Sequence, residues 1–172
     1  HFGKTGTLRP LPSERDQNAR LACGDGEYVL KIANPAEDPG QIDLQNATML
    51  HLARVGQPDI PRVVPTLAGA DHATVSVNGQ PAALRLVTWI GGTPLAEAPR
   101  SLDQLANLGR FMGGLTRSMQ GFGHPQAFRP DFPWSLDHVI QLRDHAEDIA
   151  DPARCDMVKR LFARYETQVL PR

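Results

Sequence analysis

The chain has 172 residues, 41% hydrophobic and 22% charged, which is the composition of a folded protein with one domain or one small domain and the start of another. Its 18 lysine and arginine residues nearly balance 19 aspartate and glutamate residues, so the net charge of -1 gives no reason to expect nucleic acid or an anionic membrane as partner. No apolar stretch is long enough to span a bilayer and no signal-peptide pattern opens the chain, so we expect a cytoplasmic protein.

The first thirty residues predict three strands. Thr7 to Leu11 is a short strand, and Gln17 to Cys23 alternates polar and apolar side chains as a half-buried strand does. Gly24-Asp25-Gly26 is a turn signal, and the β-forming run Tyr28 to Ile32 follows at once. Two strands joined by such a turn predict an antiparallel hairpin.

The next segment predicts a helix that begins near residue 42, after a turn at Asp38-Pro39-Gly40, and ends at Gly56 and Pro58. One face of this helix, spaced by three and four residues, carries Ile42, Gln45, Met49, Leu52 and Ala53. Three further strands are predicted at Val63 to Leu67, Ala73 to Val77 and Ala82 to Ile90. Asn78-Gly79 is a strong signal for a type I′ hairpin turn between the last two.

After Gly91-Gly92 the pattern becomes helical. Ser101 is a plausible N-cap, and the apolar residues from Leu102 to Phe122 repeat at helical spacing, so we expect that stripe to be core. A loop rich in proline and aromatic residues follows from His124 to Trp134, and we expect Trp134 to cover a pair of helices. Two more helical stretches are predicted, from about Ser135 and from about Pro152.

The cysteines and histidines form no metal or disulfide pattern. Cys23 and Cys155 lie far apart in the sequence without a partner motif, and the six histidines are scattered. We therefore expect two reduced thiols and no metal site.

Lys31 is a lone cation in an otherwise apolar strand, with Leu30 and Ile32 pointing to the opposite face. Such a lysine is stabilised either by solvent on the wet face of a sheet or by an anion. The order of hairpin, lysine-bearing strand, helix, hairpin, glycine linker and helices is that of a protein-kinase-like N-lobe. In that fold the third-strand lysine pairs with nucleotide phosphates, so the order favours the anion.

Several ordered segments carry a more specific resemblance. They are Pro12 to Asn18, Tyr28 to Asn34, Asp43 to Asn46, Leu84 to Leu95, Leu108-Gly109-Arg110 and Gly121 to Pro125. Together they resemble the hydroxylysine-kinase-like branch of the aminoglycoside phosphotransferase (choline kinase-like) superfamily, over essentially the whole chain. Some members of that branch are fused to a pyridoxal-phosphate-dependent class III aminotransferase.

The resemblance implies an α+β fold. Residues 1–90 would form a kinase-like, nucleotide-binding N-lobe made of a twisted antiparallel sheet and one helix. Residues 91–172 would form the linker and the first helices of an α-helical C-lobe. The His-x-Asp-x-x-x-x-Asn loop of the superfamily and its later acidic magnesium motif do not occur in this sequence, and the pairs His138/Asp144 and His145/Asp148 lack the asparagine. We therefore expect a fragment of a longer protein.

By position in the family motif, Lys31 would contact the α- and β-phosphates of ATP or GTP. The loop from Ser13 to Asn18 would cover the phosphates, with donors from Ser13, Gln17 and Asn18, although it contains no Gly-x-Gly-x-x-Gly. Within this loop, Arg15 is expected to pair either with a phosphate or with Glu14 or Asp16.

Two further positions follow from the resemblance. Gln45 occupies the place of the usual glutamate on the helix, where an amide can accept a hydrogen bond from Lys31 without neutralising it, and Asp43 lies on a different face. Thr88, Trp89 and Ile90 would bind the nucleobase edge through the backbone and wall the pocket, and Trp89 would also pack between the lobes.

The sequence thus predicts the N-terminal portion of a small-molecule kinase. With Mg2+ bound elsewhere, it would transfer the γ-phosphoryl group of ATP or GTP to a hydroxyl of a small amino-containing metabolite, and it would be inactive as this fragment. Its partners would be nucleotide, acceptor and the remainder of the parent chain. The alternative is a non-catalytic binding or regulatory module of a multidomain aminotransferase.

Overall fold

The computed structural model describes residues 1–129 and 135–170. These form two compact units, His1–Ala127 and Phe128–Arg172, which are described separately. The predicted lobe boundary after residue 90 stays a prediction. Trp134 lies outside the described residues, and so does its expected role.

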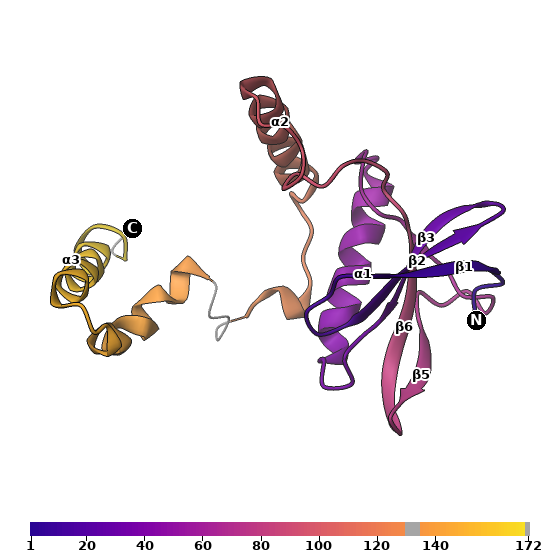
Figure 1. Ribbon diagram of the computed structural model, residues 1–172, viewed down its shortest axis with the longest axis horizontal. Helices are drawn as coiled ribbons and strands as arrows, with labels where there is room; N and C mark the ends of the chain where they lie inside the picture. The colour runs from indigo at the N-terminus through magenta and orange to yellow at the C-terminus, as the bar shows by residue number, and fades with distance from the viewer. Residues whose placement is uncertain (130–134, 171–172) are drawn as a thin grey trace. The chain divides into compact units, whose positions relative to one another are not determined.

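The first unit is built on a six-stranded antiparallel sheet (Figure 1). Its strand order is β1-β2-β3-β6-β4, and β5 pairs with β6. The strands are β1 (Gly6–Leu11), β2 (Gln17–Cys23), β3 (Gly26–Ile32), β4 (Val63–Val64), β5 (Ala73–Val77) and β6 (Gln80–Thr88). The predicted α+β fold with an antiparallel sheet is confirmed.

Tight turns set the register of both predicted hairpins. Cys23 pairs with Gly26 across the first turn, and Val77 pairs with Gln80 across the second. Asn78 and Gly79 have φ values of 50° and 79°, the positive values that a type I′ turn requires at both central positions. This register fixes which side chains of β3 and β6 share a face.

Two strand predictions needed correction. The strand predicted from Val63 to Leu67 is only the two-residue β4, because Pro65 has no N–H to donate to the ladder. The strand predicted to begin at Ala82 begins at Gln80, directly after the turn, so Pro81 lies inside β6 as an exposed residue.

Helix α1 (Pro39–Arg54) lies alongside the sheet (Figure 1) and starts earlier than predicted. The predicted turn at Asp38-Pro39-Gly40 is its N-terminus: the side chain of Asp38 accepts a hydrogen bond from the Gly40 N–H at 2.9 Å, and proline occupies the tolerated first turn. Ile42 and Leu52 are buried as predicted, whereas Gln45 is exposed and the fully buried residue beside it is Asn46. The buried side of α1 is therefore rotated towards Asn46.

One cluster of buried apolar side chains lies on the face of the sheet opposite Lys31. Leu21, Tyr28 and Leu86 form it, and Phe2, Cys23, Leu30 and Val64 pack around them. Because side chains alternate along a strand, Val29 and Lys31 of β3 face the other way, towards α1. The face of the sheet that carries Lys31 is therefore separate from this cluster.

Helix α2 (Leu102–Ser118) begins as predicted, with the Ser101 side chain accepting from the Gln104 N–H at 3.1 Å. The prediction that its apolar stripe is core is wrong: α2 has no buried residue in the described structure, and Leu102 is 84% exposed. Its C-terminal end is held by Ser118, whose hydroxyl donates to Oε1 of Gln57 at 2.7 Å. Within the first unit, no other described element buries the rest of the stripe.

The remaining helices complete both units. The 3-10 helix η1 (Pro125–Ala127) ends the first unit, and η2 (Leu136–Asp148) and α3 (Pro152–Gln168) make up most of the second. Pro152 occupies the first turn of α3, behind an Asp151 cap, as predicted. Both cysteines are free, also as predicted. No helix in the described ranges is long and apolar enough to cross a membrane.

Candidate functional site

Lys31 lies at the centre of a three-strand patch. It is paired in register with Asn18 on β2 and Arg85 on β6, so the three side chains share the face turned towards α1. The half-buried Lys31 ammonium donates a hydrogen bond to Oδ1 of Asn18 at 3.0 Å. The sheet thus aligns two cations with one neutral acceptor.

Arg85 is the residue that sequence reasoning missed. It is only 1% exposed, and its guanidinium donates to Oε1 of Gln45 at 2.9 Å and to Oδ1 of Asn46 at 3.3 Å. Nε of Arg85 and Nδ2 of Asn46 are buried without a hydrogen-bond partner among the described residues. The signal was present: Arg85 is a charged residue between Leu84 and Leu86 in an apolar strand, the same pattern that singled out Lys31.

The two cations line an open cleft of about 550 Å³ between the sheet and α1. Its lining residues are Val29, Lys31, Leu44, Gln45, Thr48, Met49, Pro61, Arg85 and Val87. Apolar walls with a few convergent polar groups are typical of small-ligand sites. Here most of the wall is apolar, and the charged groups are both positive.

The electrostatics of the cleft disfavour the two positive charges. Burial lowers the pKa of the Lys31 ammonium, the guanidinium of Arg85 lowers it further, and Asp16 acts in the opposite direction. Burial likewise lowers the pKa of Arg85, against the carboxylates of Asp16, Asp71 and Glu37. Among the described residues, neither cation has a carboxylate within 4.0 Å. The arrangement can therefore accept an anion.

Gln45 and Asp43 of α1 point to different partners. The amide oxygen of Gln45 accepts from Arg85, whereas Lys31 donates to Asn18, so the expected hydrogen bond from Lys31 to Gln45 is replaced by these two. The carboxylate of Asp43 contacts Nε2 of His124 at 3.0 Å, away from the cleft, which confirms that it lies on another face.

The loop between β1 and β2 is ordered by its own contacts. The hydroxyl of Ser13 donates to the backbone oxygen of Asp16 at 2.6 Å, and Oδ1 of Asp16 accepts from the Asn34 N–H at 3.1 Å. Arg15 pairs with Glu37 at 3.6 Å rather than with Glu14 or Asp16, because the loop lies beside the segment that follows β3. Of the predicted phosphate-covering residues, the structure brings only Asn18 to Lys31.

Thr88, Trp89 and Ile90 lie at the end of β6, beyond the residues that line the cleft. The hydroxyl of Thr88 accepts from the Arg62 N–H at 2.9 Å. The backbone N–H of Trp89 donates to the backbone oxygen of Glu27 at 2.9 Å. The Arg20 guanidinium lies 4.5 Å from the centre of the Trp89 ring. Ile90 is 45% exposed. Their predicted contacts with a nucleobase stay a prediction.

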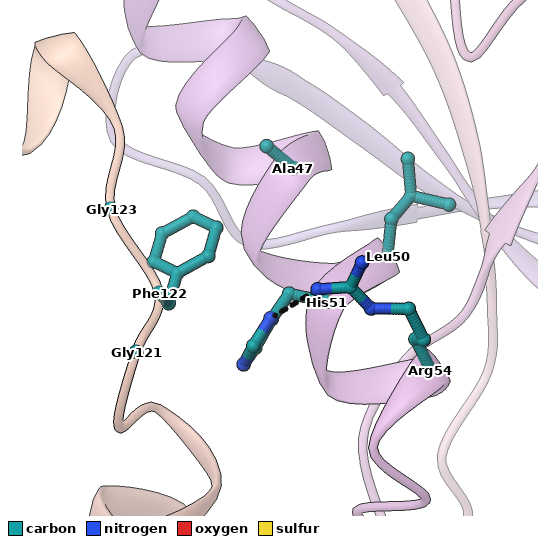
Figure 2. A pocket seen from close by; sticks show the side chains of 7 residues that line it. All are labelled: Ala47, Leu50, His51, Arg54, Gly121, Phe122 and Gly123. Atoms are coloured by element: carbon teal, nitrogen blue, oxygen red, sulfur yellow. Dashed lines mark hydrogen bonds between the residues drawn. The ribbon is translucent and has the colours of Figure 1, made fainter.

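A second pocket, of about 340 Å³, lies between α1 and residues 121–123 (Figure 2). Its lining residues are Ala47, Leu50, His51, Arg54, Gly121, Phe122 and Gly123. Both nitrogens of His51 are engaged, Nε2 with the Ser118 oxygen at 2.8 Å and Nδ1 with Arg54 at 3.2 Å, and its ring lies 5.1 Å from that of Phe122. His51 therefore ties α1 to the end of α2, and its nitrogens are not available to a ligand.

The described residues contain no group of three or more His, Cys, Asp or Glu side chains that could hold a metal ion. His145 contacts Asp148 at 3.1 Å within η2, as an exposed local pair. The first site is therefore defined by two cations and their amide partners.

Comparison with known proteins finds relatives over most of the chain. The chain is 28% identical to the hydroxylysine kinase of Mus musculus over 98% of its length, and 31% identical to that of Danio rerio over 99%; the matches cover 50% and 51% of those proteins. The chain thus spans about half the length of these curated relatives. A solved amicoumacin kinase in complex with AMP-PNP, Ca2+ and Ami has a similar fold, with a TM-score of 0.65 and 14% identity over 90% of this chain and 48% of that one.

The predicted resemblance is thereby confirmed, while the predicted fusion to an aminotransferase is not shown and stays a prediction. A family model described as "Phosphotransferase enzyme family" matches residues 7–171. With almost its whole length matched, the chain belongs to the phosphotransferase enzyme family.

Proposed function

We propose that the complete protein is a small-molecule kinase that transfers the γ-phosphoryl group of ATP or GTP to a hydroxyl of a small amino-containing metabolite. In this proposal, the present chain supplies the cleft that binds the nucleotide phosphates. The observation that carries it is Lys31, a half-buried cation that lines a cleft without a carboxylate partner among the described residues. Its curated relatives, the hydroxylysine kinases, support an amino-containing acceptor.

The residues of the cleft fit a polyphosphate. Lys31 offers an ammonium that Asn18 orients at 3.0 Å, and Arg85 adds a second positive charge directly across the strand pair. Val29 and Val87 exclude water from the same wall, which strengthens the attraction between these cations and an anion. Bound nucleotide supplies the transferable phosphoryl group; the protein's part here is to bind and position it.

The remaining catalytic parts are expected outside this chain. The proposed Mg2+ has no ligand set among the described residues, and the sequence has no His-x-Asp-x-x-x-x-Asn loop. Since the chain covers about half of each hydroxylysine kinase, we place the general base and the metal ligands in the other half of the complete protein.

The test is Lys31→Ala in the full-length protein, with ATP or GTP and hydroxylysine, homoserine or choline as acceptors. We expect turnover to fall by about 100-fold or more, because one preorganised charge at a phosphoryl-transfer site is typically worth that much. Lys159→Ala is the matched control, since Lys159 pairs with Glu147 in the second unit. Turnover that survives Lys31→Ala would show that Lys31 is only a solvated strand residue.

A second candidate is a nucleotide-binding module without transfer activity. It is favoured by the amide of Gln45, which faces the cations where the family usually has a carboxylate. In that case the full-length protein would bind ATP in a Lys31-dependent way and yet show no turnover with any acceptor. Turnover by the wild-type full-length protein therefore separates the two candidates.

A further inference from the structure

Two cations face each other across β3 and β6, and every side chain that binds them is neutral. Lys31 is the register partner of Arg85, and like charges directly opposite in a sheet destabilise it. Asn18 binds Lys31, while Gln45 and Asn46 bind Arg85. All three partners are amides, which orient a cation without neutralising it.

The burial of Arg85 makes this arrangement costly. A buried charge is normally paired and fully hydrogen-bonded, because its desolvation is expensive. Arg85 is 1% exposed, yet its Nε has no hydrogen-bond partner. The pair therefore places two positive charges next to the open cleft, where Lys31 is half-buried.

The geometry points to Arg85 as a positioning residue for the nucleotide, a role that rests on the proposed function. We propose that Arg85 fastens α1 to the sheet through Gln45 and Asn46, leaving Lys31 without a carboxylate partner. The phosphates of the nucleotide then serve as the counter-charge of the Lys31–Arg85 pair. In the family pattern, a lysine and a glutamate connect the helix to the sheet. Here, an arginine and two amides make that connection.

This arrangement explains why an amide suits position 45. Oε1 of Gln45 lies 2.9 Å from the Arg85 guanidinium, so a carboxylate in its place would form an ion pair with Arg85. That ion pair would neutralise one of the two cations and repel an incoming phosphate. Restoring the family's usual glutamate should therefore weaken nucleotide binding.

The experiment measures binding of ATP and of adenosine to the full-length protein by calorimetry, in wild type, Gln45→Glu and Arg85→Gln. We expect Gln45→Glu to weaken ATP binding by about tenfold, the factor that corresponds to 1.4 kcal/mol, and to leave adenosine binding within about twofold of wild type. Ala53→Glu is the matched control: it adds the same charge to an exposed position of α1 outside the cleft and should change neither affinity.

Arg85→Gln should likewise weaken ATP binding more than adenosine binding. If that variant fails to fold, Gln45→Glu decides alone, because it changes an exposed amide into a carboxylate of the same size. A Gln45→Glu protein that binds ATP as well as or better than wild type overturns the inference, since glutamate would then be clamping Lys31. Equal losses for ATP and adenosine would also overturn it, by indicating a purely structural role.

Failure of the inference differs from failure of the proposed function. Suppose that wild type binds ATP, that Lys31→Ala abolishes this binding and that Gln45→Glu does not change it. Only the positioning role of Arg85 is then rejected. A wild-type protein that binds no ATP at all would contradict both the inference and the proposed function.

Discussion

At the scale of single residues, the surroundings of Lys31 disfavour its positive charge. Burial and the neighbouring Arg85 both lower its pKa, and its one hydrogen-bond partner is the neutral Asn18. In the unfolded chain neither effect operates, so the same ammonium binds its proton more tightly there. Protein stability should therefore depend on pH through this one side chain.

The expected sign follows from the lowered pKa. Below the folded-state pKa of Lys31 the charge destabilises the fold in full, and this cost is relieved as the pH rises through that value towards 10.5. Lys31→Met removes the cost at every pH. We predict that the variant is more stable than wild type at about pH 7 and that its advantage narrows by pH 10.5, the ordinary value for a lysine.

Urea unfolding of both proteins at the two pH values measures this difference, and the titration of other groups cancels in the comparison. Parallel stability curves would show that the lysine is solvated in the native state as fully as in the unfolded one. The same result would weaken the idea that this face needs an anion.

At the scale of elements, the pairing of β1 with β2 depends on a close backbone approach. Gly6 is paired with Cys23, and a Cβ added at Gly6 would lie 2.0 Å from the backbone oxygen of Ala22. A backbone atom cannot move aside as a flexible side chain does. The edge strand must therefore shift if any side chain is placed there.

We predict that Gly6→Ala lowers the free energy of unfolding by about 1 to 3 kcal/mol, the usual cost of overpacking. Gly24→Ala is the control, because a Cβ at Gly24 meets nothing within 4 Å and its φ is not positive. Thermal unfolding of the two variants and wild type measures the contrast. Equal stability of the two variants would show that β1 can move away from β2 without loss.

The elements that local signals determine could be predicted from the sequence. Turn residues located both hairpins, and the limits of β5 and the N-cap of α2 were predicted correctly because Asn78-Gly79 and Ser101 act on their immediate neighbours. The start of α1 was missed because Asp38-Pro39-Gly40 has the composition of both a turn and a capped helix start.

Features that depend on distant partners could not be predicted in this way. The periodic stripe of α2 indicates an amphipathic helix but not which element covers it. Likewise, the position of Lys31 was evident from its strand, whereas its cross-strand neighbour Arg85 depends on the order of strands, in which β6 and not β1 lies next to β3. The site therefore emerged only once the sheet was assembled.

At the scale of the whole molecule, this chain contains the cleft that we propose to bind phosphate, and its sequence has no His-x-Asp-x-x-x-x-Asn loop. We predict that residues 1–172 alone transfer no phosphoryl group from ATP or GTP to hydroxylysine, homoserine or choline above background. The physical reason is that the sequence lacks the His-x-Asp-x-x-x-x-Asn loop, which would supply a base for the acceptor hydroxyl, and that no ligand set among the described residues holds Mg2+.

A coupled assay for ADP or GDP release with purified residues 1–172 measures this, and the full-length protein serves as the positive control. Robust turnover that depends on magnesium would contradict both the missing-loop interpretation and the assignment of roles between the two halves of the protein. Weak binding of ATP without turnover is the expected behaviour of the isolated chain.

Nε of Arg85 and Nδ2 of Asn46, which have no hydrogen-bond partner among the described residues, affect how such a protein evolves. Replacing buried charged groups by apolar side chains of similar volume is often neutral or stabilising. Selection for heat resistance alone would therefore be expected to discard this arginine and asparagine early, whereas selection for catalysis would keep them at a loss of stability. Directed evolution of thermostable variants should be screened for activity at every round, because a stabilising mutation at Arg85 would change the lining of the proposed nucleotide cleft.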